Sequence, residues 1–272
     1  MLTNIRLALF VACALIVTCA PHLHAQTASK AQTTLSQAAE QGKYTFILFY
    51  KANDAATTAM NTTLQTALAK YKGAATFTFV YVADPNEQEL VKKYDVARAP
   101  MPMTLAIAPN GALTGMFPQK MEATHVDSSF VTPTMMQAMK ALQENKLVFV
   151  TVQGNVAATE PVALREFASD PHFNTRMVSL TANASDPAEA KFMAEMEVDP
   201  RSPATQLSLL APPGVLVGKF ASNTPMKTIA AALAEAGKCC DDPNCKHHQQ
   251  QQGQPQQPAN RGATAPAPGA KR

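Results

Sequence analysis

An internal duplication constrains this chain more than any other feature of its sequence. The segment YDVARAPMPMTLAIAPNGALTGMF, residues 94–117, recurs as MEVDPRSPATQLSLLAPPGVLVGKF, residues 196–220. The two segments share valine, proline, glycine and phenylalanine at corresponding places, and the offset grows by one residue across the proline-rich turn. The match continues upstream, where Asp84-Pro85 corresponds to Asp186-Pro187. A long repeat of this kind indicates two copies of one folding unit.

Length and composition agree with two globular domains. A chain of 272 residues can bury one core in each half, and its hydrophobic content of 46% is typical of globular proteins. The formal net charge is only +3, and no run of lysine and arginine occurs in the body of the chain. The composition therefore argues against nucleic acid as a partner.

The first 25 residues have the pattern of a signal peptide. Arg6 supplies a positive charge, an apolar run covers 7–17, and Leu-His-Ala at 23–25 provides a cleavage site. The apolar run is too short to span a bilayer comfortably. We expect cleavage after residue 25, export to the periplasm or cell envelope or secretion from the cell, and no transmembrane segment in the mature protein. The alternatives are a retained N-terminal anchor and lipidation at Cys19.

The first repeat predicts a helix followed by strand, helix, strand, helix, hairpin and helix. Aromatic and branched residues predict strands at 44–50 and 76–82 that are both buried on their two faces. Helical spacing, hydroxyl or aspartate starts and a PNG turn predict the remaining elements. These are helices at 33–42, 58–71 and from 84 onward, a hairpin of strands 103–108 and 112–117, and a closing helix at 132–143.

The second repeat predicts the same order of elements. Its strands are expected at 146–152 and 176–182, its hairpin around 212–214, and its helices at 159–168, from 186 onward, and at 226–236. A strand, helix and parallel strand followed by a hairpin give a mixed sheet with helices on both faces. The predicted fold class is α/β, with domains at 26–143 and 144–237.

This order of elements resembles the thioredoxin-like fold, as two tandem units over residues 33–236. In that family an aromatic-rich strand leads into a Cys-x-x-Cys motif at the start of the next helix. The resemblance places Asp54 and Thr57 where the two cysteines would lie. It also implies that Pro102 is the family's cis-proline, with Pro100 as the alternative.

The chain departs from the family at this motif, because neither repeat contains a cysteine. Thiol chemistry requires a thiolate at the helix start and a second thiol to resolve the mixed disulfide. An aspartate at that place is instead expected to cap the helix, and the second repeat has Val156 there. The resemblance therefore implies a redox-inactive site whose loop and proline-led strand bind an extended chain. The residues expected to line this groove are Asn53, Asp54, Ala55, Thr57, Met101 and Pro102.

Other catalytic constellations are missing from the two repeats. Their histidines, His125 and His172, are expected on the surface, and spacing places no nucleophile or carboxylate beside either one. No glycine-rich phosphate loop occurs. We therefore expect no enzymatic activity from the repeats themselves.

The segment KCCDDPNCKHH, residues 238–248, contains every cysteine that follows the signal peptide. Its thiols and imidazoles are ligands that Zn(II) and Cu(I) favour. In an exported protein, a disulfide between the third cysteine and one of the first two is the alternative, with the odd cysteine left for intermolecular pairing. A mobile dithiol that passes electrons is the third possibility. The residues concerned are Cys239, Cys240, Cys245, His247 and His248.

Residues 249–272 are rich in glutamine, proline and alanine, and we expect them to form a disordered tail. The sequence thus predicts an exported, redox-inactive thioredoxin-like protein that acts as a protein-binding or peptide-binding module or scaffold. One alternative is zinc or copper binding through the cysteine and histidine cluster. The other alternative is a thiol-disulfide oxidoreductase that uses the tail cysteines.

Overall fold

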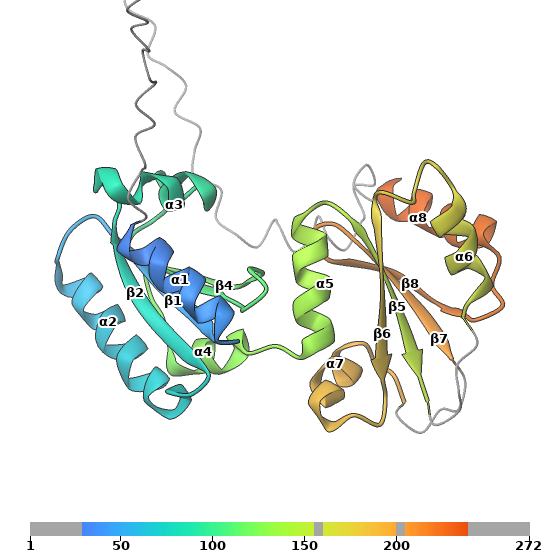
Figure 1. Ribbon diagram of the computed structural model, residues 1–272, viewed down its shortest axis with the longest axis horizontal. Helices are drawn as coiled ribbons and strands as arrows, with labels where there is room; N and C mark the ends of the chain where they lie inside the picture. The colour runs from blue at the N-terminus through green and yellow to red at the C-terminus, as the bar shows by residue number, and fades with distance from the viewer. Residues whose placement is uncertain (1–28, 155–159, 200–204, 239–272) are drawn as a thin grey trace, which may run out of the picture.

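The computed structural model describes residues 29–154, 160–199 and 205–238, which form two α/β units side by side (Figure 1). The first unit contains α1 (Lys30–Glu40), β1 (Tyr44–Tyr50), α2 (Ala55–Leu68), η1 (Ala69–Tyr71), β2 (Ala75–Tyr81), η2 (Pro85–Glu87), α3 (Gln88–Lys93), β3 (Met103–Ile107), β4 (Leu113–Pro118) and α4 (Ala123–Ser129). The second unit contains α5 (Pro133–Gln143), β5 (Leu147–Gln153), α6 (Val162–Ser169), β6 (Met177–Asn183), η3 (Pro187–Glu189), α7 (Ala190–Glu195), β7 (Gln206–Ala211), β8 (Val215–Ala221) and α8 (Met226–Lys238).

Each unit has one four-stranded mixed sheet, and the strand order is the same in both. The orders are β2-β1-β3-β4 and β6-β5-β7-β8. In each sheet the first two strands along the chain pair in parallel, and the other neighbouring strands pair antiparallel. The predicted α/β class, with a mixed sheet in each of two tandem units, is confirmed.

The apolar sequence of β1 explains why helices cover both faces of the first sheet. Successive side chains of a strand point to opposite faces. Phe46 and Leu48 accordingly pack with Met60 and Leu64 of α2, whereas Phe49 belongs to the core that α1 and α3 cover. Phe46 and Phe49 are fully buried, and each contributes about 1.5–3 kcal/mol by leaving water.

The glycine and phenylalanine shared by the two hairpins have a common packing reason. In β4 the ring of Phe117 lies across Gly115, so that a Cβ there would come within 2.6 Å of the ring. In β8 the ring of Phe220 lies across Gly218 in the same way, at 2.8 Å from such a Cβ. Neither position has room for a side chain, which accounts for a glycine at this place in both copies.

The predicted role of the helix at 132–143 is wrong. We expected it to close the first unit, but α5 covers the second sheet as α1 covers the first. Its buried residues Ala138 and Ala141 belong to one core cluster with Val148 and Val150 of β5. The first unit is closed by α4, which the sequence analysis missed and which packs against α2 and β4. An amphipathic stripe shows that a helix is covered, but not by which sheet.

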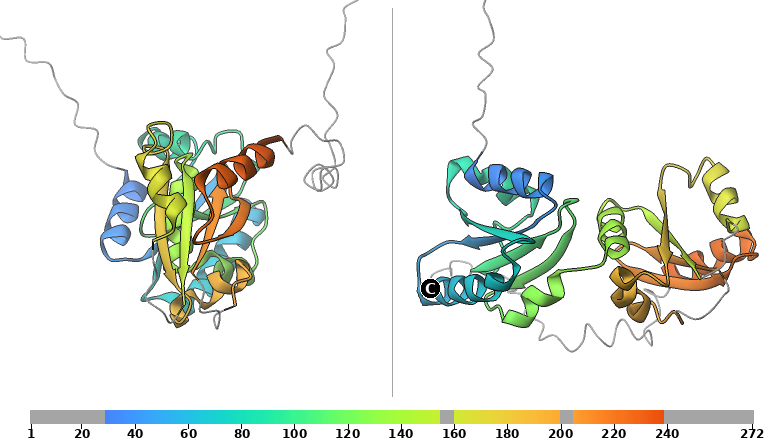
Figure 2. Two further views of the ribbon diagram at one scale, coloured as in Figure 1. Left: turned by 90° about the vertical axis from the view of Figure 1, so that its right-hand side faces the viewer. Right: turned by 60° about the horizontal axis from the view of Figure 1, so that its bottom comes forward.

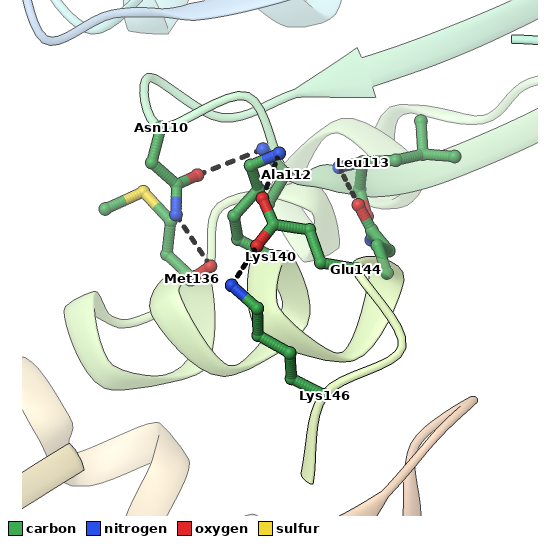
Figure 3. Close-up of polar contacts among 8 residues, drawn as sticks. Asn110, Ala112, Leu113, Met136, Lys140, Glu144 and Lys146 are labelled. Carbon is green, nitrogen blue, oxygen red and sulfur yellow. Dashed lines mark hydrogen bonds and ion pairs between the residues drawn. The ribbon is translucent and has the colours of Figure 1, made fainter. Parts of the chain in front are cut away.

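The side of α5 turned away from the second sheet contacts the first unit (Figure 3). The side-chain amide of Asn110 donates to the Met136 carbonyl oxygen at 2.9 Å. Gln143 accepts from the Leu113 backbone N–H at 2.9 Å and donates to the Leu113 carbonyl oxygen at 2.7 Å. Met136 and Met139 pack against the core cluster of the first unit. The views in Figures 1 and 2 show α5 between the two sheets, so this helix joins the units directly.

Candidate functional site

The register of the first sheet brings the predicted groove segments to one edge. Phe49, near the end of β1, is paired with Met103 at the start of β3, and Tyr50 is paired with Tyr81 at the end of β2. The loop that follows β1 and the segment that precedes β3 therefore lie at the same end of the sheet. The peptide bond between Met101 and Pro102 is cis, which confirms the proline that the resemblance indicated.

Asp54 is the N-cap of α2, as predicted. Its carboxylate accepts a hydrogen bond from the Thr57 backbone N–H at 2.8 Å. This bond holds the pKa of the Asp54 carboxyl below its ordinary value. The Thr57 hydroxyl donates to the Ala52 carbonyl oxygen at 2.9 Å. The two residues at the positions of the family's cysteines thus stabilise the start of the helix.

The six predicted groove residues differ in exposure. Asn53, Asp54 and Ala55 are exposed, Met101 is half-buried against the core, and Thr57 and Pro102 are buried. The surface that a partner could reach in this group therefore consists of the loop before α2 and part of Met101. Binding of a partner here stays a prediction.

A cavity of about 350 Å³ opens beside this loop on the α2 face of the sheet. Two of its lining residues, Asn53 and Thr57, are predicted groove residues, and the other four were not predicted. The lining consists of Tyr50, Asn53, Thr57, Thr58, Asn61 and Phe79. Neither Met101 nor Pro102 is among the lining residues. The cavity combines aromatic rings with uncharged amide and hydroxyl groups, the kind of lining that ligand sites often have.

The prediction that β2 is buried on both faces is wrong. Thr78 and Val80 are buried, but Phe79 is 41% exposed and Tyr81 is 44% exposed. The reason is that β2 lies at the edge of the sheet and pairs with β1 alone among the described strands. The alternation of TFTF indicated two unlike faces, as is typical of a strand covered on one side. It did not indicate which face is covered, because Thr78 is buried and Phe79 is exposed.

Among its described residues, the second unit has no comparable aromatic surface at this place. In the first sheet, Phe46 of β1 is paired with Phe77 of β2. At the same place in the second sheet, Phe149 of β5 is paired with Ser179 of β6, so Ser179 corresponds to Phe77. The next two outward positions of β6 are Thr181 and Asn183, both exposed. Its loop at 155–159 lies outside the described residues.

Of the two histidines in the repeats, His125 has a structural role. His125 is half-buried rather than on the surface, and its ring stacks on Phe117 with centroids 4.8 Å apart. Its Nδ1 accepts from the Glu122 backbone N–H at 3.1 Å, as part of a capping box at the start of α4. His172 is exposed, as predicted, in the turn before β6.

The cysteine and histidine cluster of the tail, residues 239–248, lies outside the described residues. Within the described ranges, no group of three or more histidine, cysteine or acidic residues could hold a metal ion. None of the helices in those ranges has the length and hydropathy needed to cross a bilayer.

Neither a family model nor a curated protein sequence matches the chain. Solved structures do resemble it. The disulphide isomerase from Xylella fastidiosa Temecula1 is 18% identical, and the match covers 42% of this chain and 93% of that one with a TM-score of 0.29. A thioredoxin from Thermus thermophilus is also 18% identical, with 43% and 95% covered and a TM-score of 0.29.

One two-domain structure matches a longer part of the chain. The first two thioredoxin domains of Saccharomyces cerevisiae Eps1p are 8% identical, and the match covers 74% of this chain and 94% of that one with a TM-score of 0.29. By strand order, strand pairing and the position of the cis-proline in the first unit, the chain is a tandem pair of thioredoxin-like units.

Proposed function

We propose that the protein is a redox-inactive binding module for an extended protein or peptide segment, exported from the cytoplasm, with its site at the end of the first sheet. The observation that carries the proposal is the position and role of Asp54. A capping carboxylate stands where the family chemistry needs a thiolate, and it lies on an exposed loop beside the cavity of Tyr50 and Phe79.

The chemistry of this loop suits recognition rather than catalysis. Asp54 carries a negative charge at neutral pH, because the hydrogen bond from the Thr57 backbone N–H favours the ionised form. The exposed amide of Asn53 can donate to and accept from the backbone of a bound chain. The neighbouring cavity accepts an apolar side chain of that segment against Phe79. An extended peptide bound in this way uses backbone hydrogen bonds for affinity and the cavity for selectivity.

The test is a binding titration with a fluorescently labelled, permanently unfolded protein. We expect Asn53→Arg and Asp54→Lys each to weaken binding at least tenfold. Asp54→Asn is the matched control, because asparagine caps a helix as well as aspartate does. A loss with Asp54→Lys that Asp54→Asn does not share separates the binding surface from helix capping. Unchanged binding in both Asn53→Arg and Asp54→Lys would remove the loop as the site.

The same titration distinguishes the tandem units from the tail. A variant in which Cys239, Cys240 and Cys245 are all replaced by serine is expected to bind as well as the unaltered protein. This variant is also expected to show no turnover in a dithiol-exchange assay. Loss of binding with the tail cysteines would move the function to the tail.

A further inference from the structure

We propose that the free edge of β2 pairs antiparallel with β2 of a second copy of this chain, about a two-fold axis at Thr78. The two first-unit sheets then become one continuous sheet. This inference goes beyond the proposed function, because it assigns a second partner and the free edge of β2. The two surfaces meet at Phe79, which also lines the cavity of the proposed site.

The edge of β2 lacks the features that usually prevent strand pairing. Its register with β1 runs unbroken over the whole strand, and the strand ATFTFVY contains no charge and no proline. Two other edge strands are protected. The β3–β4 pairing shifts register at Ala106 and β4 ends in Pro118, whereas the β7–β8 pairing shifts at Leu209 and β8 carries Lys219. Bulges, prolines and charges of this kind block edge-to-edge association.

The outward face of β2 is an aromatic row. Phe77 and Phe79 meet edge to face with centroids 5.4 Å apart, and Tyr81 lies 5.6 Å from Tyr50 of β1. Phe77 also packs against the core cluster of the first unit. The fold does not require the exposed Phe79 and Tyr81, because the remaining edge strand β6 has threonine and asparagine at the same two places. An exposed aromatic row next to an unprotected strand edge indicates a surface that another chain covers.

The strand and its flanks are complementary to themselves. In an antiparallel pairing about Thr78, Phe77 of each copy faces Phe79 of the other, and aromatic cross-strand pairs stabilise sheets. Lys72 precedes the strand and Asp84 follows it, so the antiparallel arrangement brings opposite charges together at both ends. Lys72 is exposed and has no ion pair among the described residues. A second copy thus satisfies the backbone edge, the aromatic row and the flanking charges at once.

The first test is sedimentation equilibrium over a range of concentrations. It uses mature protein with the three tail cysteines replaced by serine, so that tail disulfides cannot produce dimers. We expect a mass twice that of the monomer, and we expect Phe79→Asp to return the protein to monomers. The matched control is Thr181→Asp, at the corresponding place on β6, which should remain dimeric with the same circular dichroism. Monomers at every concentration, or a dimer that survives Phe79→Asp, would overturn the proposal.

The second test fixes the register. Phe77→Cys and Phe79→Cys proteins, prepared separately in the same background, should form a disulfide when mixed and oxidised. Neither should form one alone, because the like residues are diagonal neighbours whose Cα atoms are roughly 7–8 Å apart, beyond the reach of a disulfide. Equal cross-linking in the separate proteins would contradict the pairing about Thr78. Asp54→Lys should leave the dimer intact, so failure of the proposed function and failure of this inference are distinguishable.

Discussion

The outward side chains of β2 are Phe77, Phe79 and Tyr81, whereas the same register positions of β6 carry Ser179, Thr181 and Asn183. The two strands have the same length, and each pairs in parallel with the first strand of its own sheet, β1 or β5. Their outward side chains are aromatic in β2 and polar in β6. Because one copy forms this edge without aromatic residues, the strand itself does not require the exposed Phe79 and Tyr81, whereas Phe77 also packs against the core of the first unit. The proposed pairing with a second copy gives the two exposed rings a role.

The two units also hold their first helices by the same device. Glu87 and Glu189, at corresponding places in η2 and η3, are buried acids whose carboxylates accept hydrogen bonds from the starts of α1 and α5. The bond from the Ala31 backbone N–H to Glu87 measures 3.3 Å. Glu189 accepts from both the backbone N–H and the hydroxyl of Thr134, at 2.9 and 2.8 Å. Glu189 therefore makes more hydrogen bonds to α5, and shorter ones, than Glu87 makes to α1.

The largest expected effect is at Glu189. Glu189→Ala leaves two donors of Thr134 unpaired in the interior and should lower the free energy of unfolding by about 1–3 kcal/mol. Glu87→Ala should cost less, because it removes one longer bond. Urea unfolding followed by circular dichroism measures both. The controls are Glu189→Gln and Glu87→Gln, which keep a carbonyl acceptor and should cost less than the alanine variants. An equal or larger loss at Glu87 would contradict the difference between the units.

A smaller effect is expected at the junction between the units. The turn of the first hairpin holds α5 through Asn110, and the corresponding place in the second hairpin is Pro213, which has no side-chain donor. The double variant Asn110→Ala, Gln143→Ala should lower the free energy of unfolding by about 0.5–1.5 kcal/mol for the part-buried hydrogen bond of Asn110. The exposed hydrogen bonds of Gln143 should contribute less. The two units should then tumble with separate correlation times in nitrogen-15 relaxation measurements. Gln65→Ala, on α2, is the control and should leave one common correlation time. A single correlation time in the double variant would contradict the junction.

Much of the fold could be predicted because both repeats contain the same pattern of helices and strands. The strands, the hairpins and the Asp54 cap depend on local patterns, and the cis-proline at 102 was predicted from the resemblance to the thioredoxin-like fold. The place of α5 could not be predicted, because its apolar stripe fits either neighbouring sheet. Of the groove residues, Thr57 and Pro102 proved to be buried, since exposure depends on which side chains surround them. The exposure of Phe79 depends on the strand order, which the sequence does not state.

The smallest expected effect is a pH dependence at the end of α5 that the end of α1 lacks. Glu144 ends α5 between Lys140 and Lys146, each 2.9 Å from its carboxylate, whereas the corresponding residue after α1 is the uncharged Gln41. The hydrogen bonds from the two lysines lower the pKa of Glu144 from its ordinary value of 4.5 to about 2. Its contribution to stability is therefore complete above about pH 4.5 and is lost as the pH falls towards 2.

Glu144→Gln should accordingly lower the Tm slightly at pH 7, and the difference from the unaltered protein should vanish near pH 2. The effect should also shrink in high salt, because both lysines and the carboxylate are partly exposed. Thermal unfolding between pH 2 and 7 measures the difference. Glu40→Gln, at the end of α1, is the matched control, because Glu40 has no ion pair among the described residues. If Glu144→Gln changes the Tm by the same amount at every pH, the charge of Glu144 does not stabilise α5. The ends of α1 and α5 would then not differ in electrostatic stabilisation.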